Sequence, residues 1–359
     1  MDESTDIPPD QAWRHLPAWE QRLMRTSPVG PVLTGLAIAA IVFASFYLVA
    51  LIDGASIFSN DARSVVGLTA EAWAAFVISL FSWAFISANE LAGRRTFTDV
   101  FILAPKLAGV RGEDLLRALE PSKERNRAGL IAAGAGLVVG AIVFLGQRNS
   151  DRPDLGVLEN FGLIDVWTLV ASMILASLVV RWVVMTRGES SIVTDSLLET
   201  AKLDLLSRSD AGIVGQIALR GAVVWLLHAA ILFLMFVGQP LNAVLIIAFL
   251  AIVAIAIMVL FTPLRWVHLL ISQTKQSELA QVRDDIRLAR QQVTHTGTDG
   301  AQAGSRLTGL LAYEARIESV SEWAINVGTL LRFAGLLSLP VISWTGGAFA
   351  ERIIDWMIG

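Results

Sequence analysis

The four histidines are the first residues to consider for metal binding or acid–base chemistry. His15, His228, His268 and His295 are scattered singly, so none of them forms the His-Glu-x-x-His spacing that holds a catalytic zinc ion. The chain has no cysteine, which excludes thiolate metal ligands and a cysteine nucleophile. It also lacks a glycine-rich phosphate loop followed by lysine. We therefore expect a protein that is not an enzyme and that holds neither a metal nor a cofactor.

His228 differs from the other histidines because it lies within an uncharged, apolar stretch, 221–238. We interpret it as a hydrogen-bonded packing residue, with a ligand, proton-relay or ion-contact role as the alternative. Placing an imidazole in hydrocarbon costs free energy, which predicts that His228 faces protein or water and not lipid. Serines at similar depth are interpreted as packing residues, because serines in membrane helices mostly form local hydrogen bonds: Ser79, Ser82, Ser172 and Ser177.

Arg181, Arg220 and Arg332 stand at the ends of apolar stretches. One interpretation is that their aliphatic stems run through the apolar layer and carry the guanidinium groups to the headgroups. The other is that they line a cytoplasmic vestibule and attract anions. In a symmetric oligomer both interpretations hold together. With His228, these arginines are the candidate pore or ion-contact residues.

Composition places these residues in a membrane protein. Of the 359 residues, 54% are hydrophobic and only 17% are charged, whereas soluble domains carry about 25% charged residues. The apolar residues gather in uncharged runs of about 15 to 24, long enough to cross a hydrocarbon core of about 30 Å. The formal net charge of −4 argues against nucleic acid as a partner. We expect an all-α, polytopic integral membrane protein whose main surroundings are the lipid bilayer.

Seven uncharged stretches are candidate membrane spans: 32–52, 72–88, 128–146, 166–180, 221–238, 241–264 and 333–350. Lysine and arginine are distributed unequally over the connections between them. Placing the N-terminus inside puts 21 basic residues on the cytoplasmic side and 4 on the outer side. Because positive residues collect in cytoplasmic loops, we expect the N-terminus in the cytoplasm and the C-terminus outside. The expected location is the cell membrane, which is the inner membrane in a bacterium.

The spans divide the chain into four regions. Residues 1–30 form a polar cytoplasmic tail, and 31–264 form a six-helix transmembrane region with cytoplasmic helical connections at 92–127 and 186–216. Residues 265–326 form a cytoplasmic helical hairpin, and 327–359 form a C-terminal transmembrane helix with an interfacial segment.

The hairpin is predicted from apolar residues that recur at steps of three and four. Leu279, Val282, Ile286 and Ala289 form one such stripe among charged residues, which is the pattern of an amphipathic helix. Residues 294–305 hold three glycines and predict a flexible turn before a second stripe. The two stripes bury each other within one subunit, or they pack against symmetry mates or another cytoplasmic protein.

Gly136 and Gly140 form a GxxxG motif, which lets two helix backbones approach closely. The neighbouring helix belongs either to the same subunit or to another one. No carboxylate or lysine falls near the middle of a predicted span, and ion-coupled transporters usually place such groups there. This distribution disfavours secondary active transport.

By elimination, and from the arginine positions, we expect a passive, homo-oligomeric membrane channel that prefers small anions. The alternative is a membrane scaffold or signalling protein that recruits a partner through its cytoplasmic hairpin.

Overall fold

The computed structural model describes residues 27–59, 67–108, 122–151, 161–200, 208–237, 243–293, 298–322 and 327–338. The helices of this part of the chain are α3 (Gly30–Ile52), α4 (Ala70–Ala108), α6 (Lys123–Asp151), α7 (Leu163–Thr200), α8 (Arg208–Phe233), η1 (Leu234–Phe236), α9 (Ala243–Val293), α10 (Thr298–Glu318) and α11 (Val327–Leu337). The described residues contain no strand beyond an isolated bridge between Phe58 and Leu68. The all-α prediction is confirmed for them.

Among the described residues, six helices are long and apolar enough to cross a membrane, namely α3, α4, α6, α7, α8 and α9. They contain the first six predicted spans except at two places. In 221–238, residues 234–236 form η1 and residue 238 lies outside the described residues; in 241–264, residues 241 and 242 lie outside them. Large apolar side chains cover their outer surfaces: Ile41 is 67% exposed and Ile131 is 65% exposed. Such a surface suits lipid and not water. The prediction of a polytopic membrane protein is thereby supported.

The seventh span, 333–350, stays a prediction. Only its first residues are described, within and just after α11, which is 11 residues long. Among them, Phe333 is buried against the core of the bundle.

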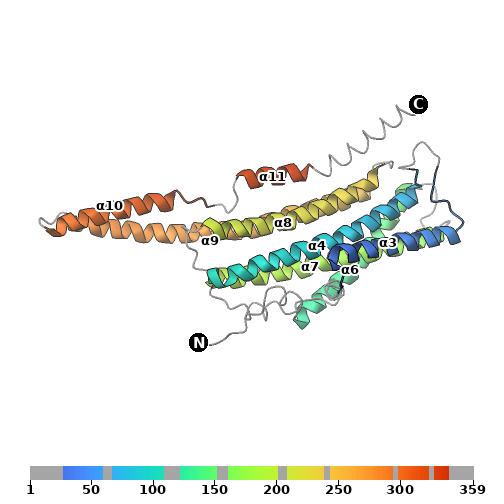
Figure 1. Ribbon diagram of the computed structural model, residues 1–359, viewed down its shortest axis with the longest axis horizontal. Coiled ribbons are helices and arrows are strands. Elements are labelled where there is room, and N and C mark those ends of the chain that lie inside the picture. The colour runs from blue at the N-terminus through green and yellow to red at the C-terminus, as the bar shows by residue number, and fades with distance from the viewer. Residues whose placement is uncertain are drawn as a thin grey trace, which may run out of the picture.

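The membrane-length helices lie side by side in an elongated bundle (Figure 1). Chain neighbours pack in pairs: α3 with α4, α6 with α7, and α8 with α9. The helix α4 contacts α3, α7 and α8, so it joins these pairs into one body. The main core lies where α4, α8 and α9 meet and includes Phe81, Trp225 and Leu260.

Indole groups connect neighbouring helices at the bundle ends. The Trp73 Nε1 of α4 donates to the Leu234 carbonyl, 2.9 Å away. The Trp167 Nε1 of α7 donates to the Ser45 Oγ of α3, also 2.9 Å away. Each contact buries a large apolar ring while its only polar atom keeps a partner.

Two connections differ from the expected short helices. The helices α4 and α7 continue beyond their apolar stretches to Ala108 and Thr200, so much of 92–127 and 186–216 extends the membrane helices. No proline interrupts the chain between 163 and 200, and the backbone ladder of α7 therefore propagates past its apolar run. Residues 109–121 of the first connection lie outside the described residues.

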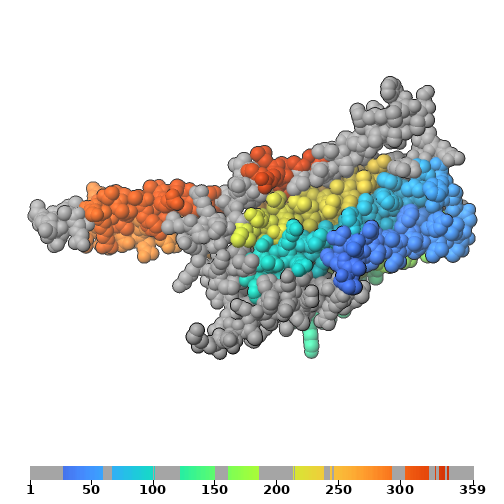
Figure 2. All heavy atoms as spheres, viewed as in Figure 1, coloured from blue at the N-terminus to red at the C-terminus, as the bar shows by residue number. Residues whose placement is uncertain are grey.

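Helix α9 has 51 residues, which at 1.5 Å per residue gives a length of about 77 Å, more than twice a hydrocarbon core of about 30 Å. Its last part extends beyond the bundle, with α10 packed along it (Figures 1 and 2). The two run antiparallel, because Arg283 contacts Glu314 while His268, earlier on α9, contacts Glu322. We call α10, the part of α9 after Leu264, and the residues up to Glu322 the α9–α10 arm.

Gly136 and Gly140 lie on the face of α6 that packs against α7. A Cβ atom added to Gly136 would lie 2.5 Å from the Ser177 Cα, and one added to Gly140 would lie 2.5 Å from the Met173 Cα. Real Cβ atoms do not approach other atoms so closely. The GxxxG motif therefore serves a helix contact within this subunit.

Substituting Gly140 by alanine is expected to lower the stability of the protein by about 1–3 kcal/mol, because the new methyl group forces α6 away from the α7 backbone. Gly134 is a matched control, since a Cβ there meets nothing within 4 Å. Its alanine variant is expected to be neutral or stabilised by up to about 1 kcal/mol. Unfolding of both variants in mixed micelles measures this difference, and equal effects would contradict the packing role.

Candidate functional site

His228 lies on α8 in the main core and is 0% exposed. Its Nδ1 is 2.6 Å from the Val224 carbonyl oxygen, one turn earlier on the same helix. Because a carbonyl only accepts hydrogen bonds, Nδ1 carries a proton and donates it. The other ring nitrogen, Nε2, is buried and has no hydrogen-bond partner among the described residues. In the neutral imidazole, the lone pair of Nε2 therefore lies in the interior of the bundle without a hydrogen-bond donor among the described residues.

Aromatic rings surround the His228 imidazole. The ring centroids of Phe81 and Phe85 on α4 lie 5.0 and 5.4 Å from it, and that of Trp225 lies 5.7 Å away. Phe81 and Phe85 are one turn apart on α4, and Trp225 is three residues before His228, so each pair shares a helix face. Trp182 of α7 completes the group, 5.9 Å from Phe85. We call these five residues the His228 cluster.

Asn89 is another buried polar residue, on α4, and sequence reasoning overlooked it. It is 8% exposed, and neither its amide oxygen nor its amide nitrogen has a hydrogen-bond partner among the described residues. It lies four residues after Phe85, so it occupies the same face of α4, one turn further along. An asparagine beside an apolar run is a sequence signal, because its burial is costly, but Asn89 lies one residue beyond the predicted span 72–88.

Arg220 is paired with an acidic residue of α4. Its Nη2 lies 2.9 Å from the Asp99 carboxylate, and its Nη1 lies 3.4 Å from the Thr96 hydroxyl. The side chains of Arg220 and Asp99 are 24% and 29% exposed. The guanidinium charge is thus neutralised within the subunit at the α4–α8 contact. Sequence reasoning missed Asp99 because the pairing depends on which helices are neighbours.

The other two candidate arginines lie on different helices. Arg181 is on α7, immediately before Trp182, and is partly buried. Arg332 is on α11, which packs against α8, and it is exposed. The three arginines therefore belong to three helices; Arg181 and Arg220 are partly buried, and Arg332 is exposed.

A further ion pair joins α6 to α7 at the end of the bundle opposite the Arg220–Asp99 pair. Arg148 near the end of α6 pairs with Asp165 in the first turn of α7, and Arg148 is only 7% exposed. Its guanidinium also lies 4.9 Å from the centre of the Phe161 ring. Asp165 accepts a hydrogen bond from the Gly162 amide, 3.0 Å away, which satisfies a backbone donor at the start of α7.

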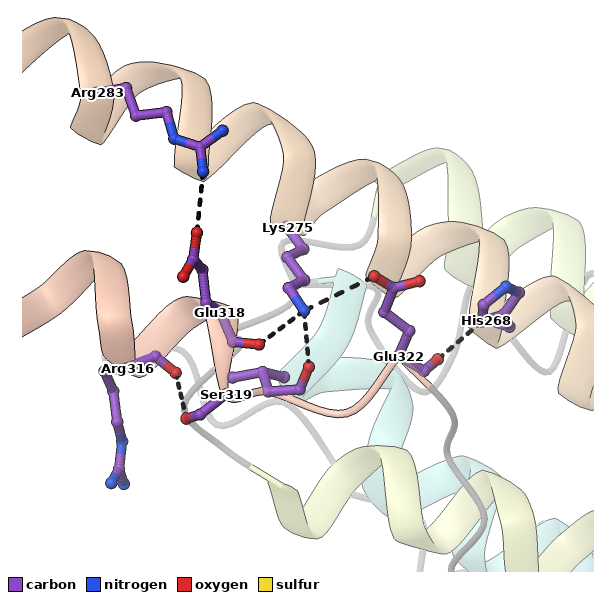
Figure 3. A network of polar contacts seen from close by, with 8 residues as sticks. His268, Lys275, Arg283, Arg316, Glu318, Ser319 and Glu322 are labelled. Atoms are coloured by element: carbon purple, nitrogen blue, oxygen red, sulfur yellow. Dashed lines mark hydrogen bonds and ion pairs between the residues drawn. The ribbon is translucent and has the colours of Figure 1, made fainter.

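Lys275 of α9 contacts the C-terminal end of α10 through hydrogen bonds and an ion pair. Its Nζ donates to the carbonyl oxygens of Glu318 and Val320, each 3.0 Å away, and lies 3.6 Å from the Glu322 carboxylate (Figure 3). The last carbonyls of a helix lack partners within the helix, and a cation near them also interacts favourably with the helix dipole. Lys275 is 14% exposed.

Arg283 makes a second set of contacts along the α9–α10 arm. Its guanidinium lies 2.7 Å from the Glu314 carboxylate and 2.9 Å from that of Glu318. These pairs are solvent-exposed and contribute less than the contacts of Lys275, whose side chain is only partly exposed.

We expect the Lys275→Met variant to lose about 1–3 kcal/mol of stability in the arm, because two helix-end carbonyls lose a charged donor. Hydrogen exchange of the amides near the end of α10 should accelerate. Arg287→Met is the matched control, since Arg287 pairs with Asp284 only at the surface, and a loss below about 0.5 kcal/mol is expected there. Equal exchange in both variants would contradict the capping role.

The comparisons with known proteins assign no role to these residues. No protein-family model, curated protein or solved structure matches the chain.

Proposed function

We propose that the protein is a membrane scaffold whose α9–α10 arm lies in the cytoplasm and assembles with the arm of a second copy. The observation that carries this proposal is the continuity of α9. One unbroken helix holds both an apolar, membrane-length segment and the charged arm. The helix continues through Pro263, which removes one backbone hydrogen bond where the apolar segment passes into the arm, so the two parts are joined by helix and not by a loop.

The surface of the arm supports self-assembly. Leu288, Leu311 and Tyr313 are 58%, 48% and 38% exposed. Residues 265–322 contain seven basic and seven acidic residues, so this segment has no formal net charge. A neutral surface with exposed apolar side chains meets no net repulsion from its own copy, and it attracts neither nucleic acid nor an anionic membrane surface.

Because Leu288 and Leu311 are exposed, their aspartate variants should fold normally but lose the contact between copies. The measurement is the mass of the intact protein in lipid nanodiscs at several concentrations. We expect the wild type to dimerise or form larger assemblies, and the Leu288→Asp, Leu311→Asp double variant to shift at least tenfold toward the monomer. Ser305→Asp, an exposed change on α10, is the control and should assemble like the wild type. A monomeric wild type would contradict the proposal.

A passive anion channel is the second candidate. The favouring observation is Arg332, which is exposed on α11. In a symmetric oligomer such residues would form a cationic ring that concentrates anions. The filled core around His228 means that a pore would run between subunits and not through one.

Chloride flux into proteoliposomes tests this candidate. Arg332→Glu should reduce or invert anion selectivity, with a smaller effect at high salt because charge screening is stronger. Arg220 is less informative, since its substitution also breaks the pair with Asp99. Silent proteoliposomes across pH and voltage would rule the channel out and leave the scaffold.

A further inference from the structure

The helix α6 packs against α7 along one side and leaves the opposite side exposed. Gly136 and Gly140 lie on the packed side, where an added Cβ atom would strike the α7 backbone. On the opposite side, Ile131 is 65% exposed and Val138 is 59% exposed. These two residues are two helical turns apart and therefore share one face. The structure thus leaves an apolar stripe of α6 open at the surface of the bundle.

Two basic residues extend this stripe beyond its apolar end. Arg127 immediately precedes the uncharged stretch 128–146, Lys123 lies one turn earlier, and both are exposed. Within the part of the chain that the structure describes, neither has an ion-pair partner. Residues 123–127 hold three basic residues and one acidic residue, Glu124, which is a formal net charge of +2. We call the following residues the exposed α6 stripe: Lys123, Arg127, Ile131, Gly134 and Val138.

The length of the exposed α6 stripe matches one leaflet of a bilayer. Arg127 and Val138 are 11 positions apart, which along a helix corresponds to about 16 Å. Half of a hydrocarbon core of about 30 Å is about 15 Å. With Arg127 at the depth of the headgroups, the apolar part of the stripe therefore ends near the middle of the bilayer. Gly134 lowers the surface within it, and a Cβ atom added there would meet nothing within 4 Å.

This order of charge and apolar surface selects the occupant. A ligand that satisfies the whole stripe has an anionic head for the two cations and an acyl chain for the apolar part. Free phosphate would leave Ile131 and Val138 uncovered. A second copy that met this stripe symmetrically would bring its own Lys123 and Arg127 against these cations, and like charges repel. An anionic phospholipid fits both halves.

We propose that the exposed α6 stripe binds an anionic phospholipid. Lys123 and Arg127 donate charge-assisted hydrogen bonds to the headgroup phosphate, and one acyl chain lies along Ile131, Gly134 and Val138. Basic residues next to a membrane helix attract anionic lipids by about 1 kcal/mol each, which is about fivefold in affinity. The stripe is on α6, away from the α9–α10 arm, so this site is independent of the scaffold function.

Photo-crosslinking of the full chain in phosphatidylcholine nanodiscs tests the site. The nanodiscs contain a small fraction of a probe lipid with a diazirine in one acyl chain, and the headgroup of the probe is either phosphatidylglycerol or phosphatidylcholine. Mass spectrometry maps the adducts, and the yield on residues 130–142 of α6 is divided by the yield on residues 36–48 of α3. The α3 segment is the internal reference, because it exposes apolar side chains such as Ile41 to lipid in any properly folded variant.

In the wild type, we expect this ratio to be at least about fivefold higher for the phosphatidylglycerol probe than for the phosphatidylcholine probe. The Lys123→Gln, Arg127→Gln double variant should reduce it to the phosphatidylcholine value. The matched control is the Arg95→Gln, Arg265→Gln double variant, which removes the same charge from exposed positions after the apolar stretches of α4 and α9. It should keep the wild-type ratio.

Three results would overturn the proposal. Equal ratios for the two probes in the wild type would show that α6 does not prefer an anionic lipid. An equal fall in both double variants would show a general attraction to the positive charge of the protein and not a site on α6. Adducts on α3 without any on α6 would show that protein, such as a second copy, covers the exposed α6 stripe.

Discussion

The cost of an unpaired polar group in hydrocarbon is the constraint on which this structure depends. It explains why the membrane-length segments are helices, whose backbone groups bond within the segment. It also explains the side chains: the hydroxyls of Ser79 and Ser82 bond to carbonyls of α4, 2.8 and 2.9 Å away. Charges near the ends are paired, as Arg220 is with Asp99. Asn89 and His228 depart from this rule, because both are buried and hold polar atoms without a hydrogen-bond partner among the described residues.

Once the backbone is satisfied, packing decides which helices are neighbours. Close approach of α6 and α7 depends on Gly136 and Gly140, where a methyl group would strike the opposite backbone. The junction of α4, α7 and α8 uses large rings instead, with Phe85 and Trp182 in edge-to-face contact. These two kinds of contact hold a rigid bundle from which α9 extends. The α9–α10 arm is fastened by polar contacts such as those of Lys275, which suit an aqueous surface.

The membrane-length helices could be predicted from the sequence because uncharged apolar runs of this length are typical of membrane-spanning helices. The residues at which α4 and α7 end could not be predicted, because both helices continue beyond their apolar runs and the hydrophobicity of the sequence does not mark these ends. The position of His228 in the core followed from the cost of an imidazole in lipid, but its aromatic neighbours depend on the contact between α4 and α8. Arg220 was recognised as a charge at a helix end, whereas its pairing with Asp99 joins residues that are 121 positions apart.

The central claim is that α9 carries the chain from the membrane into an arm on the cytoplasmic side. Single cysteines at Ser56, between α3 and α4, and at Ser277 in the arm test it most directly, because the chain has no cysteine of its own and both sites are exposed. Cells expressing each variant are treated with a membrane-impermeant thiol reagent before and after permeabilisation. The cysteine at Ser56 should label in intact cells, and that at Ser277 only after permeabilisation. Labelling of both in intact cells, or of neither, would contradict the account.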